Sequence, residues 1–243
     1  MYQLIHLFIS LNKCYFIDDM KDKLLIENID VTICGEVENP KYLFIINTFK
    51  DEIDDIYNQI ISLNEKAIYA LIEVPSWNEY LSPWYAGAVF KGGEDFKGEG
   101  DKYLKLLIDT IIPTIRSQYN LQDTKIIIGG YSLAGLFALY SIYKTDIFDG
   151  CISASGSLWF EDFKEYIEKH DLLNENCLIY LSLGDKEANS KNNILKEVQN
   201  ITEYIYHIYL DSGYRCTFEL NEGNHFKDPG LRLIKGIKWI LKQ

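Results

Sequence analysis

The chain has 243 residues, of which 47% are hydrophobic and 25% are charged, the balance of an ordinary globular domain with a large core. Its 36 acidic and 24 basic side chains give a formal net charge of −12. This charge argues against binding to nucleic acid or to an anionic membrane, because both need a basic face on the protein.

Strands and helices are predicted along the first part of the chain. Leu4–Ser10 and Leu24–Cys34 have the composition of strands and are expected to form an antiparallel edge. Tyr42–Ile46 is a continuous apolar run, which is typical of a buried strand. Asp51–Leu63 carries isoleucines at helical spacing, and Ile68–Val74 is expected to form a further strand.

The stretch Pro75–Gly100 interrupts this order. It is rich in glycine and aromatic residues, including Trp84. A long irregular loop in a compact domain is usually functional, so the stretch is a candidate for an aromatic wall over a substrate site. The alternative is a packed loop that only covers the core.

In the second part of the chain, Asp101–Tyr119 has the apolar spacing of an amphipathic helix, and we expect Pro113 to kink it. The elements that follow alternate: strand Ile126–Ile128, a helix from Leu133, strand Gly150–Ala154, helix Glu161–His170, strand Leu178–Leu183, helix Lys191–Asp211, strand Cys216–Asn221 and helix Gly230–Leu241. This alternation predicts one α/β domain over residues 1–243, with a mostly parallel sheet and helices on both faces.

Ser132 is the candidate nucleophile. An apolar strand runs into Gly129 and Gly130, the serine follows, and a helix begins at once. This is the strand–turn–helix context of a Gly-x-Ser-x-small elbow, in which small residues such as Gly130 and Ala134 must flank the serine. The alternative is a structural turn whose glycines only let strand and helix pack closely.

His225 is the candidate general base, because a serine hydroxyl needs a group that takes its proton. It lies in the loop between the last strand and the last helix, which places it at the carboxyl edge of the sheet together with Ser132. The other histidines fit less well: His6 lies far upstream, His170 ends a helix, and His207 sits inside one.

A carboxylate should orient the histidine, and two follow strand Leu178–Leu183. These are Asp185 and Glu187, and the residues alone do not choose between them. The resulting order of serine, acid and histidine along the chain is the order of an α/β-hydrolase. For the oxyanion we expect the backbone N–H of Leu133 and a second N–H from Thr48 or Phe49.

Few features of the sequence indicate a cofactor or a cellular compartment. Five cysteines form an odd, scattered set without a Cys-x-x-Cys pair, which argues against disulfides and favours the cytoplasm. The first residues lack a basic start and a signal-peptide cleavage site, and no apolar run approaches the length of a membrane span. Zinc-site spacing, a phosphate-binding loop and a dinucleotide fingerprint are missing, so we expect no metal and no cofactor.

Several motifs, in order, resemble an esterase group of the α/β-hydrolases that contains esterase D-like and enterobactin-type siderophore esterases. They are Leu-Ser-Pro-Trp (81–84), Gly-Tyr-Ser-Leu-Ala-Gly (130–135), Ser-Gly-Ser-Leu-Trp (155–159), Gly-Asp-Lys-Glu (184–187) and Gly-Asn-His-Phe (223–226). The resemblance runs from about residue 40 to the C-terminus. It implies Glu187 as the acid, with Asp185 as the alternative, and a substrate pocket near Trp159, which otherwise belongs to a core aromatic cluster with Phe160. The short segment between Gly150–Ala154 and Leu178–Leu183 leaves no room for a large cap domain.

From these observations we expect a serine hydrolase that cleaves a small-molecule carboxylic ester through an acyl-enzyme. Ser132, His225 and Glu187 form its predicted triad, and Trp84, Trp159 and Tyr131 its predicted substrate pocket. Two rival hypotheses are an acyltransferase that uses the same triad and a binding module that has lost catalysis on a hydrolase fold.

Overall fold

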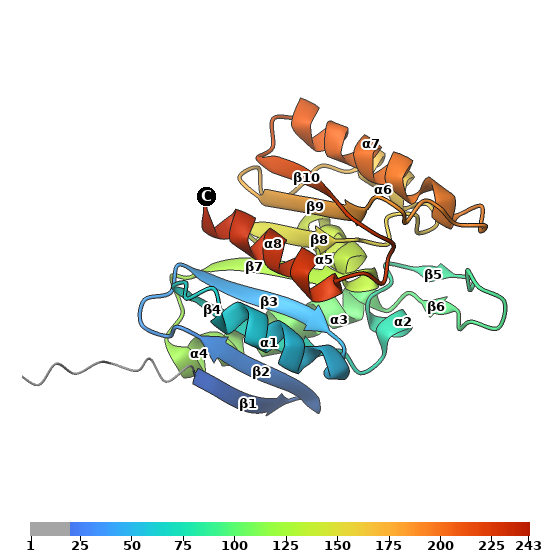
Figure 1. Cartoon of the computed structure of the whole chain (residues 1–243). Coiled ribbons are helices and arrows are strands. Elements are labelled where there is room, and N and C mark those ends of the chain that lie inside the picture. The colour runs from blue at the N-terminus through green and yellow to red at the C-terminus, as the bar shows by residue number, and fades with distance from the viewer. Residues whose placement is uncertain (1–19) are drawn as a thin grey trace, which may run out of the picture.

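A twisted eight-stranded sheet forms the centre of the molecule in the computed structural model, which describes residues 20–243 (Figure 1). The strand order is β1-β2-β4-β3-β7-β8-β9-β10. The bounds are β1 (Met20–Ile26), β2 (Ile29–Gly35), β3 (Tyr42–Thr48), β4 (Ala67–Glu73), β7 (Lys125–Tyr131), β8 (Gly150–Ala154), β9 (Leu178–Gly184) and β10 (Cys216–Asn221). From β4 to β10 all neighbours run parallel, whereas β1 and β2 pair antiparallel at the edge. The predicted sheet with its antiparallel N-terminal edge is confirmed.

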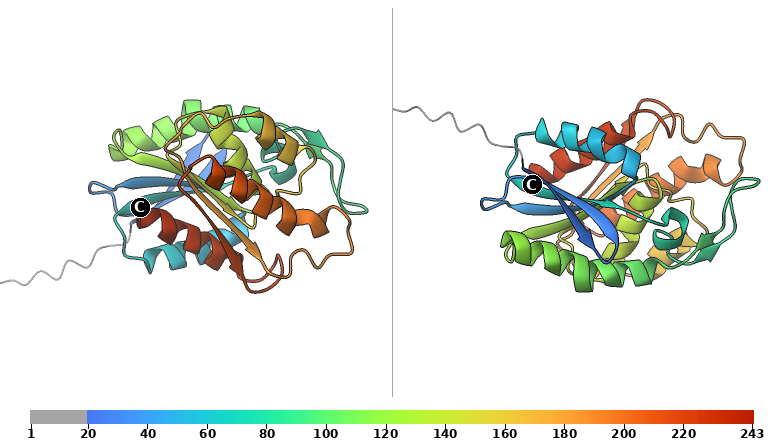
Figure 2. Two further views of the ribbon diagram at one scale, coloured as in Figure 1. Left: turned by 90° about the horizontal axis from the view of Figure 1, so that it is seen from above. Right: turned by 90° about the horizontal axis from the view of Figure 1, so that it is seen from below.

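Helices cover both faces of this sheet, as Figure 2 shows. On one face lie α1 (Ile53–Ile61) and α8 (Pro229–Leu241), and on the other α3 (Gly100–Leu106), α4 (Ile112–Tyr119), α5 (Leu133–Lys144), α6 (Phe163–Lys169) and α7 (Val198–Asp211). A hydrophobic core lies on each face of the sheet, and successive residues of a strand point to opposite faces. Phe44 and Ile46 therefore belong to the core on the side of α8, while Leu43 and Ile45 belong to the other core. Every residue of α5 except its last is buried, because this helix crosses the middle of its layer.

The predicted strand Leu24–Cys34 is wrong as a single element, since it contains a hairpin. Glu27 and Asn28 both have positive φ (50° and 62°), the conformation of a two-residue turn that reverses the chain between β1 and β2. The predicted strand Leu4–Ser10 lies outside the described residues.

The helix predicted over Asp101–Tyr119 is interrupted just before Pro113. A π-helical turn, η2 (Leu107–Ile111), separates α3 from α4, which has Pro113 in its first turn. Proline has no N–H to donate to the carbonyl four residues earlier, and a π turn absorbs the missing bond without ending the helix.

The stretch predicted as the irregular loop Pro75–Gly100 is more ordered than expected. It contains the short helix α2 (Trp77–Tyr80) and a hairpin of two short strands, β5 (Tyr85–Ala86) and β6 (Phe96–Lys97). Gly98 allows the hairpin base to close, because an added Cβ would lie 2.4 Å from the carbonyl carbon of Trp84. The hairpin projects beyond the carboxyl edge of the sheet (Figure 1).

The predicted helix Lys191–Asp211 begins later than expected, with the 3₁₀ turn η3 (Leu195–Glu197) followed by α7. The Asn192 side chain accepts a hydrogen bond from the Ile194 N–H (2.8 Å) and donates one to the carbonyl of Val89 on the hairpin (2.9 Å). The residues before α7 are therefore held by the hairpin as well as by the backbone hydrogen bonds of the 3₁₀ turn.

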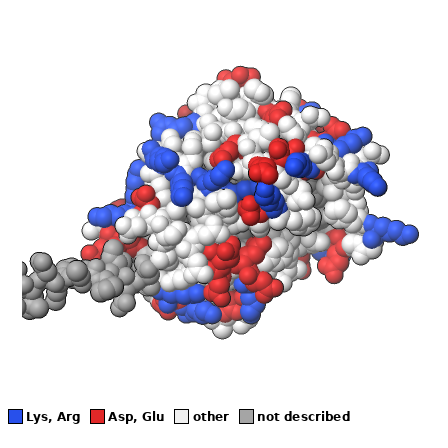
Figure 3. Space-filling model, in the orientation of Figure 1, with Lys and Arg blue, Asp and Glu red and all other residues white. Residues whose placement is uncertain are grey.

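Acidic side chains gather on one part of the face in Figure 3, over η1 (Lys50–Glu52) and the start of α1. The group comprises Asp51, Glu52, Asp54 and Asp55. Within residues 20–243, no helix is both long and apolar enough to cross a membrane.

Candidate active site

Ser132 lies in the sharp turn between β7 and α5. Its φ of 58° and ψ of −120° fall in a region that residues other than glycine rarely adopt. Backbone hydrogen bonds hold the turn: the Ser132 N–H donates to Ala154 O, and the Ser157 N–H donates to Ser132 O, each at 3.0 Å. A Cβ on Gly130 would lie 2.3 Å from the Cβ of Ala134, so this turn requires a glycine there.

His225 reaches Ser132 from the loop between β10 and α8. Its Nε2 lies 3.0 Å from Ser132 Oγ. The hydroxyl of Tyr131, the last residue of β7, donates a hydrogen bond to the carbonyl of His225 (2.6 Å) and so holds the loop against the sheet. The imidazole keeps 30% of its surface exposed, so it remains accessible from the cavity side.

The other histidines lie elsewhere. His170 follows α6 and its Nδ1 lies 2.7 Å from the carbonyl of Tyr166, while His207 is part of α7. His6 is outside the described residues.

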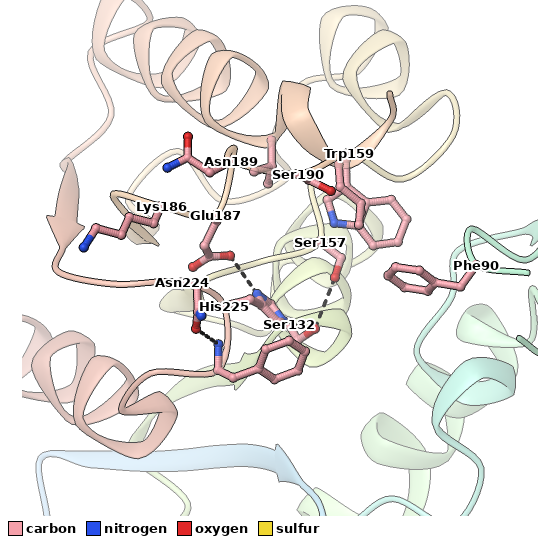
Figure 4. A pocket seen from close by; sticks show the side chains of 13 residues that line it. Phe90, Ser132, Ser157, Trp159, Lys186, Glu187, Asn189, Ser190, Asn224 and His225 are labelled. Atoms are coloured by element: carbon pink, nitrogen blue, oxygen red, sulfur yellow. Dashed lines mark hydrogen bonds and ion pairs between the residues drawn. The ribbon is translucent and has the colours of Figure 1, made fainter. Parts of the chain in front are cut away.

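Glu187 and Asp185 have different surroundings. Glu187 Oε2 lies 2.7 Å from His225 Nδ1, so hydrogen bonds connect the serine, the imidazole and the carboxylate in series (Figure 4). Asp185 instead accepts a hydrogen bond from the Gly223 N–H (2.7 Å), and its own N–H donates to Asn221 O at 2.7 Å. Asp185 therefore connects the loop after β9, which carries both acids, to the loop between β10 and α8, which carries His225 and is called the histidine loop below.

Arg232 on α8 completes the arrangement, and sequence reasoning missed it. Only 2% of its side chain is exposed. Nη1 lies 2.5 Å from Glu187 Oε1 and also donates to Ser155 Oγ (2.8 Å), while Nη2 donates to the carbonyls of Asn224 (2.8 Å) and Glu222 (3.3 Å). One guanidinium therefore links the acid to the loop that carries His225.

These contacts set the charge state of the acid. Burial raises the pKa of Glu187, but the hydrogen bond and charge of His225 and the hydrogen bond from the Gly184 N–H (2.7 Å) lower it by more. The net pKa lies below the ordinary value of 4.5, so the group is a carboxylate at neutral pH. Burial raises the pKa of Tyr131 to about 12, which keeps its hydroxyl protonated as a donor.

The predicted oxyanion residues lie on two elements near Ser132. Leu133 is the first residue of α5, where an N–H has no acceptor within its own helix. Phe49 follows β3, and its ring stacks on Trp77 with centroids 3.7 Å apart. The Thr48 hydroxyl turns toward η1 and donates to Glu52 Oε2 (3.1 Å).

Ser132 opens into two cavities, of about 480 Å³ and about 200 Å³. Trp159 and Phe90 line both, and Figure 4 shows their rings directed toward the cavity on the side opposite Glu187. Ser157, which the sequence analysis did not single out, also lines both, with its Oγ 3.3 Å from Ser132 Oγ.

Two residues predicted for the pocket lie outside both cavities. Trp84 is half-buried beside α5 and α6, where its ring packs against Tyr166 and its Nε1 donates to Glu161 O (3.0 Å). Tyr131 lies below the His225 loop and lines a separate small cavity beside α1. In the structure Trp84 packs in an aromatic core, and Tyr131 supports the loop that carries His225. Among residues 20–243, no group of three or more His, Cys, Asp or Glu side chains is arranged to hold a metal ion.

The fold is that of the α/β-hydrolases. The chain belongs to the family described as Putative esterase, whose model matches residues 49–229. It is 27% identical over 173 residues to YbbA, an uncharacterized protein of Bacillus subtilis (strain 168), covering 67% of this chain and 68% of that protein.

Solved structures share the fold at low identity. An IroE-like serine hydrolase from Shewanella oneidensis superposes with a TM-score of 0.76 at 15% identity, over 93% of this chain and 80% of that one. The siderophore hydrolase EstA from Aspergillus nidulans gives a TM-score of 0.72 at 14% identity, over 92% and 94%.

Proposed function

We propose that this protein is a serine esterase that hydrolyses small-molecule carboxylic esters through an acyl-enzyme. The observation that carries the proposal is the line of contacts from Ser132 Oγ to His225 Nε2 (3.0 Å) and from His225 Nδ1 to Glu187 Oε2 (2.7 Å). Membership of the esterase family supports the same class of reaction.

In the first half of the reaction, Ser132 Oγ attacks the acyl carbon while His225 Nε2 takes its proton. Glu187, held as a carboxylate, stabilises the imidazolium that forms and keeps Nδ1 protonated. The C–O bond to the alcohol then breaks, and the proton passes from Nε2 to the departing oxygen. In the second half, water attacks the acyl-enzyme with His225 again as base, and the acid is released.

The charge that develops on the carbonyl oxygen needs donors that are in place beforehand. We assign this role to the N–H of Leu133 and to a second N–H from Phe49 or Thr48. Phe49 is the stronger candidate, because its ring stacks on Trp77, which lines the same small cavity as Leu133.

The test is labelling with a fluorophosphonate probe, followed by peptide mapping, together with hydrolysis of p-nitrophenyl esters. We expect the label on Ser132, and loss of both label and turnover in Ser132→Ala. His225→Ala should lose turnover as well. A label on Ser157 would overturn the choice of nucleophile, since its hydroxyl lies 3.3 Å away. Full turnover in Ser132→Ala would overturn the mechanism.

A further inference from the structure

The two cavities at Ser132 differ in which part of the machinery they contain. His225 and Glu187 line only the larger one, of about 480 Å³. Leu133 lines only the smaller one, of about 200 Å³. Phe90, Ser157 and Trp159 line both and therefore stand at the boundary between them.

This asymmetry determines where each half of an ester lies. The departing alcohol oxygen must receive its proton from His225 Nε2, so the alcohol leaves on the side of the cavity that His225 lines. The carbonyl oxygen must turn toward the N–H of Leu133. The acyl chain then extends away from His225, and the smaller cavity is the space that remains open to it.

We propose that the larger cavity binds the alcohol part of the substrate and that the smaller one binds the acyl chain and limits its length. The assignment rests on the proposed esterase function. It defines the substrate class as esters of a short acyl group with a larger, partly apolar alcohol.

The walls of the cavities support this division. The smaller cavity is lined by Trp77, Phe96 and Val89, and also by the polar residues Asn78 and Glu94. The larger cavity has apolar walls from Leu195 and Val198 and polar groups from Asn189 and Asn224. Such a mixture suits an alcohol that carries both a ring or chain and hydrogen-bonding groups.

Two exposed aromatic side chains also line the larger cavity. Phe226 and Phe90 are 86% and 61% exposed, although each contributes to the cavity lining. They come from separate segments, the histidine loop and the hairpin. Phe226 lines only the larger cavity, so a bulky alcohol bound there would remove its ring from water, which favours binding at this side.

The experiment uses the fact that the alcohol has already left when the acyl-enzyme hydrolyses. Deacylation therefore depends on the acyl chain alone, whereas acylation depends on both halves of the ester. Val89→Trp fills the smaller cavity and Leu195→Trp fills the larger one, and both positions are half-buried aliphatic residues. Pre-steady-state bursts with acetate and hexanoate esters of p-nitrophenol and 2-naphthol separate the two rate constants.

We expect Val89→Trp to slow deacylation of the hexanoyl-enzyme by about tenfold or more, equally for both alcohols, with a smaller effect on the acetyl-enzyme. Leu195→Trp should slow acylation by about tenfold for the naphthyl esters and leave both deacylation constants within about twofold of wild type. The reverse pattern, with Leu195→Trp slowing deacylation and Val89→Trp acting through the alcohol, would overturn the assignment.

A second pair of variants covers the case in which the first pair misfolds. Ala88→Trp and Asn189→Trp stand at exposed positions of the smaller and larger cavity, and the same two patterns are expected from them. A wild-type enzyme that forms no acyl-enzyme with any ester would instead contradict the proposed function itself.

Discussion

Arg232 Nη1 and Glu187 Oε1 lie 2.5 Å apart in the interior, with 2% and 4% of their side chains exposed. The other carboxylate oxygen of Glu187 lies 2.7 Å from His225 Nδ1. The acid is thus held from two sides, by a charge that does not titrate and by the imidazole that it orients. In the proposed triad Arg232 is therefore a positioning residue, which acts on the reaction through Glu187.

We expect Arg232→Met to destabilise the protein by about 3–5 kcal/mol, because it leaves a buried carboxylate without its cation. The matched control is Lys235→Met on the same helix. Lys235 pairs with Glu219 at a site where both side chains are more than one third exposed, so at most about 1 kcal/mol is expected. Urea unfolding measures both. A loss in Arg232→Met no larger than in the control would show that the buried pair contributes little.

The two acids of the loop after β9 should separate in kinetics. Glu187→Gln removes the negative charge that stabilises the imidazolium and disturbs the tautomer, so kcat/KM for p-nitrophenyl esters should fall by about 10³- to 10⁴-fold. Asp185→Asn keeps an oxygen that accepts from the Gly223 N–H, so its effect should stay within about tenfold. A larger loss in Asp185→Asn than in Glu187→Gln would reverse the assignment of the acid.

The amino-acid sequence predicts Ser132 and His225 as a catalytic pair because each is marked by its neighbours in the chain, and the fold brings His225 Nε2 to 3.0 Å from Ser132 Oγ. The serine needs flanking small residues in a strand–turn–helix segment, and the histidine follows the last strand of a regular alternation. The sequence alone leaves Asp185 and Glu187 open, since their difference depends on contacts with a loop 38 residues away.

Arg232 carries no such local mark. On an amphipathic helix a cation is expected to face water, and its burial depends on acceptors at Glu187, Ser155 and the 222–224 loop, which only the folded chain brings together. The hairpin within Pro75–Gly100 is similar: its strands have two residues each, too short for any periodicity, and its base closes where Gly98 meets Trp84.

Stability should fall in acid partly through Glu187. Its pKa is lower in the folded protein than the ordinary 4.5, so the unfolded chain binds the proton more readily. The stabilisation is therefore fully present above about pH 4.5 and is lost as the pH falls through the lower, folded pKa. We expect the urea midpoint of wild type to drop over this acid range and that of Glu187→Gln to drop less steeply.

Salt provides the control for this pH effect. The pKa of Glu222 is also lowered, by its hydrogen bond and charge interaction with Lys227, but that pair lies at the surface. In about 1 M salt, where the screening length is about 3 Å, the contribution of Glu222 should be weakened while that of Glu187 persists. If the fall of the urea midpoint with decreasing pH disappears entirely in high salt, the effect comes from ion pairs at the surface and not from Glu187.

The elbow should tolerate no side chain at Gly130. An added Cβ would lie 2.3 Å from Ala134 Cβ and 2.9 Å from its carbonyl carbon, so Gly130→Ala must shift the turn. We expect a loss of about 1–3 kcal/mol, and a loss of turnover because Ser132 moves relative to His225. Gly87→Ala is the matched control, since nothing lies within 4 Å of its added Cβ. Equal stability of the two variants would contradict the crowding at the elbow.

The strain in the Ser132 backbone should be relieved when glycine replaces the serine, which should raise the free energy of unfolding relative to alanine. At φ 58° and ψ −120° glycine is relaxed and alanine is not, so Ser132→Gly should be more stable than Ser132→Ala by about 1 kcal/mol or more. Ser141, in the middle of α5, provides the opposite expectation, because there glycine should be less stable than alanine by about 1 kcal/mol. Urea midpoints of the four variants give both differences. If glycine and alanine at position 132 are equally stable, the turn stores no strain, and the rest of the fold spends no free energy on holding Ser132 in this conformation.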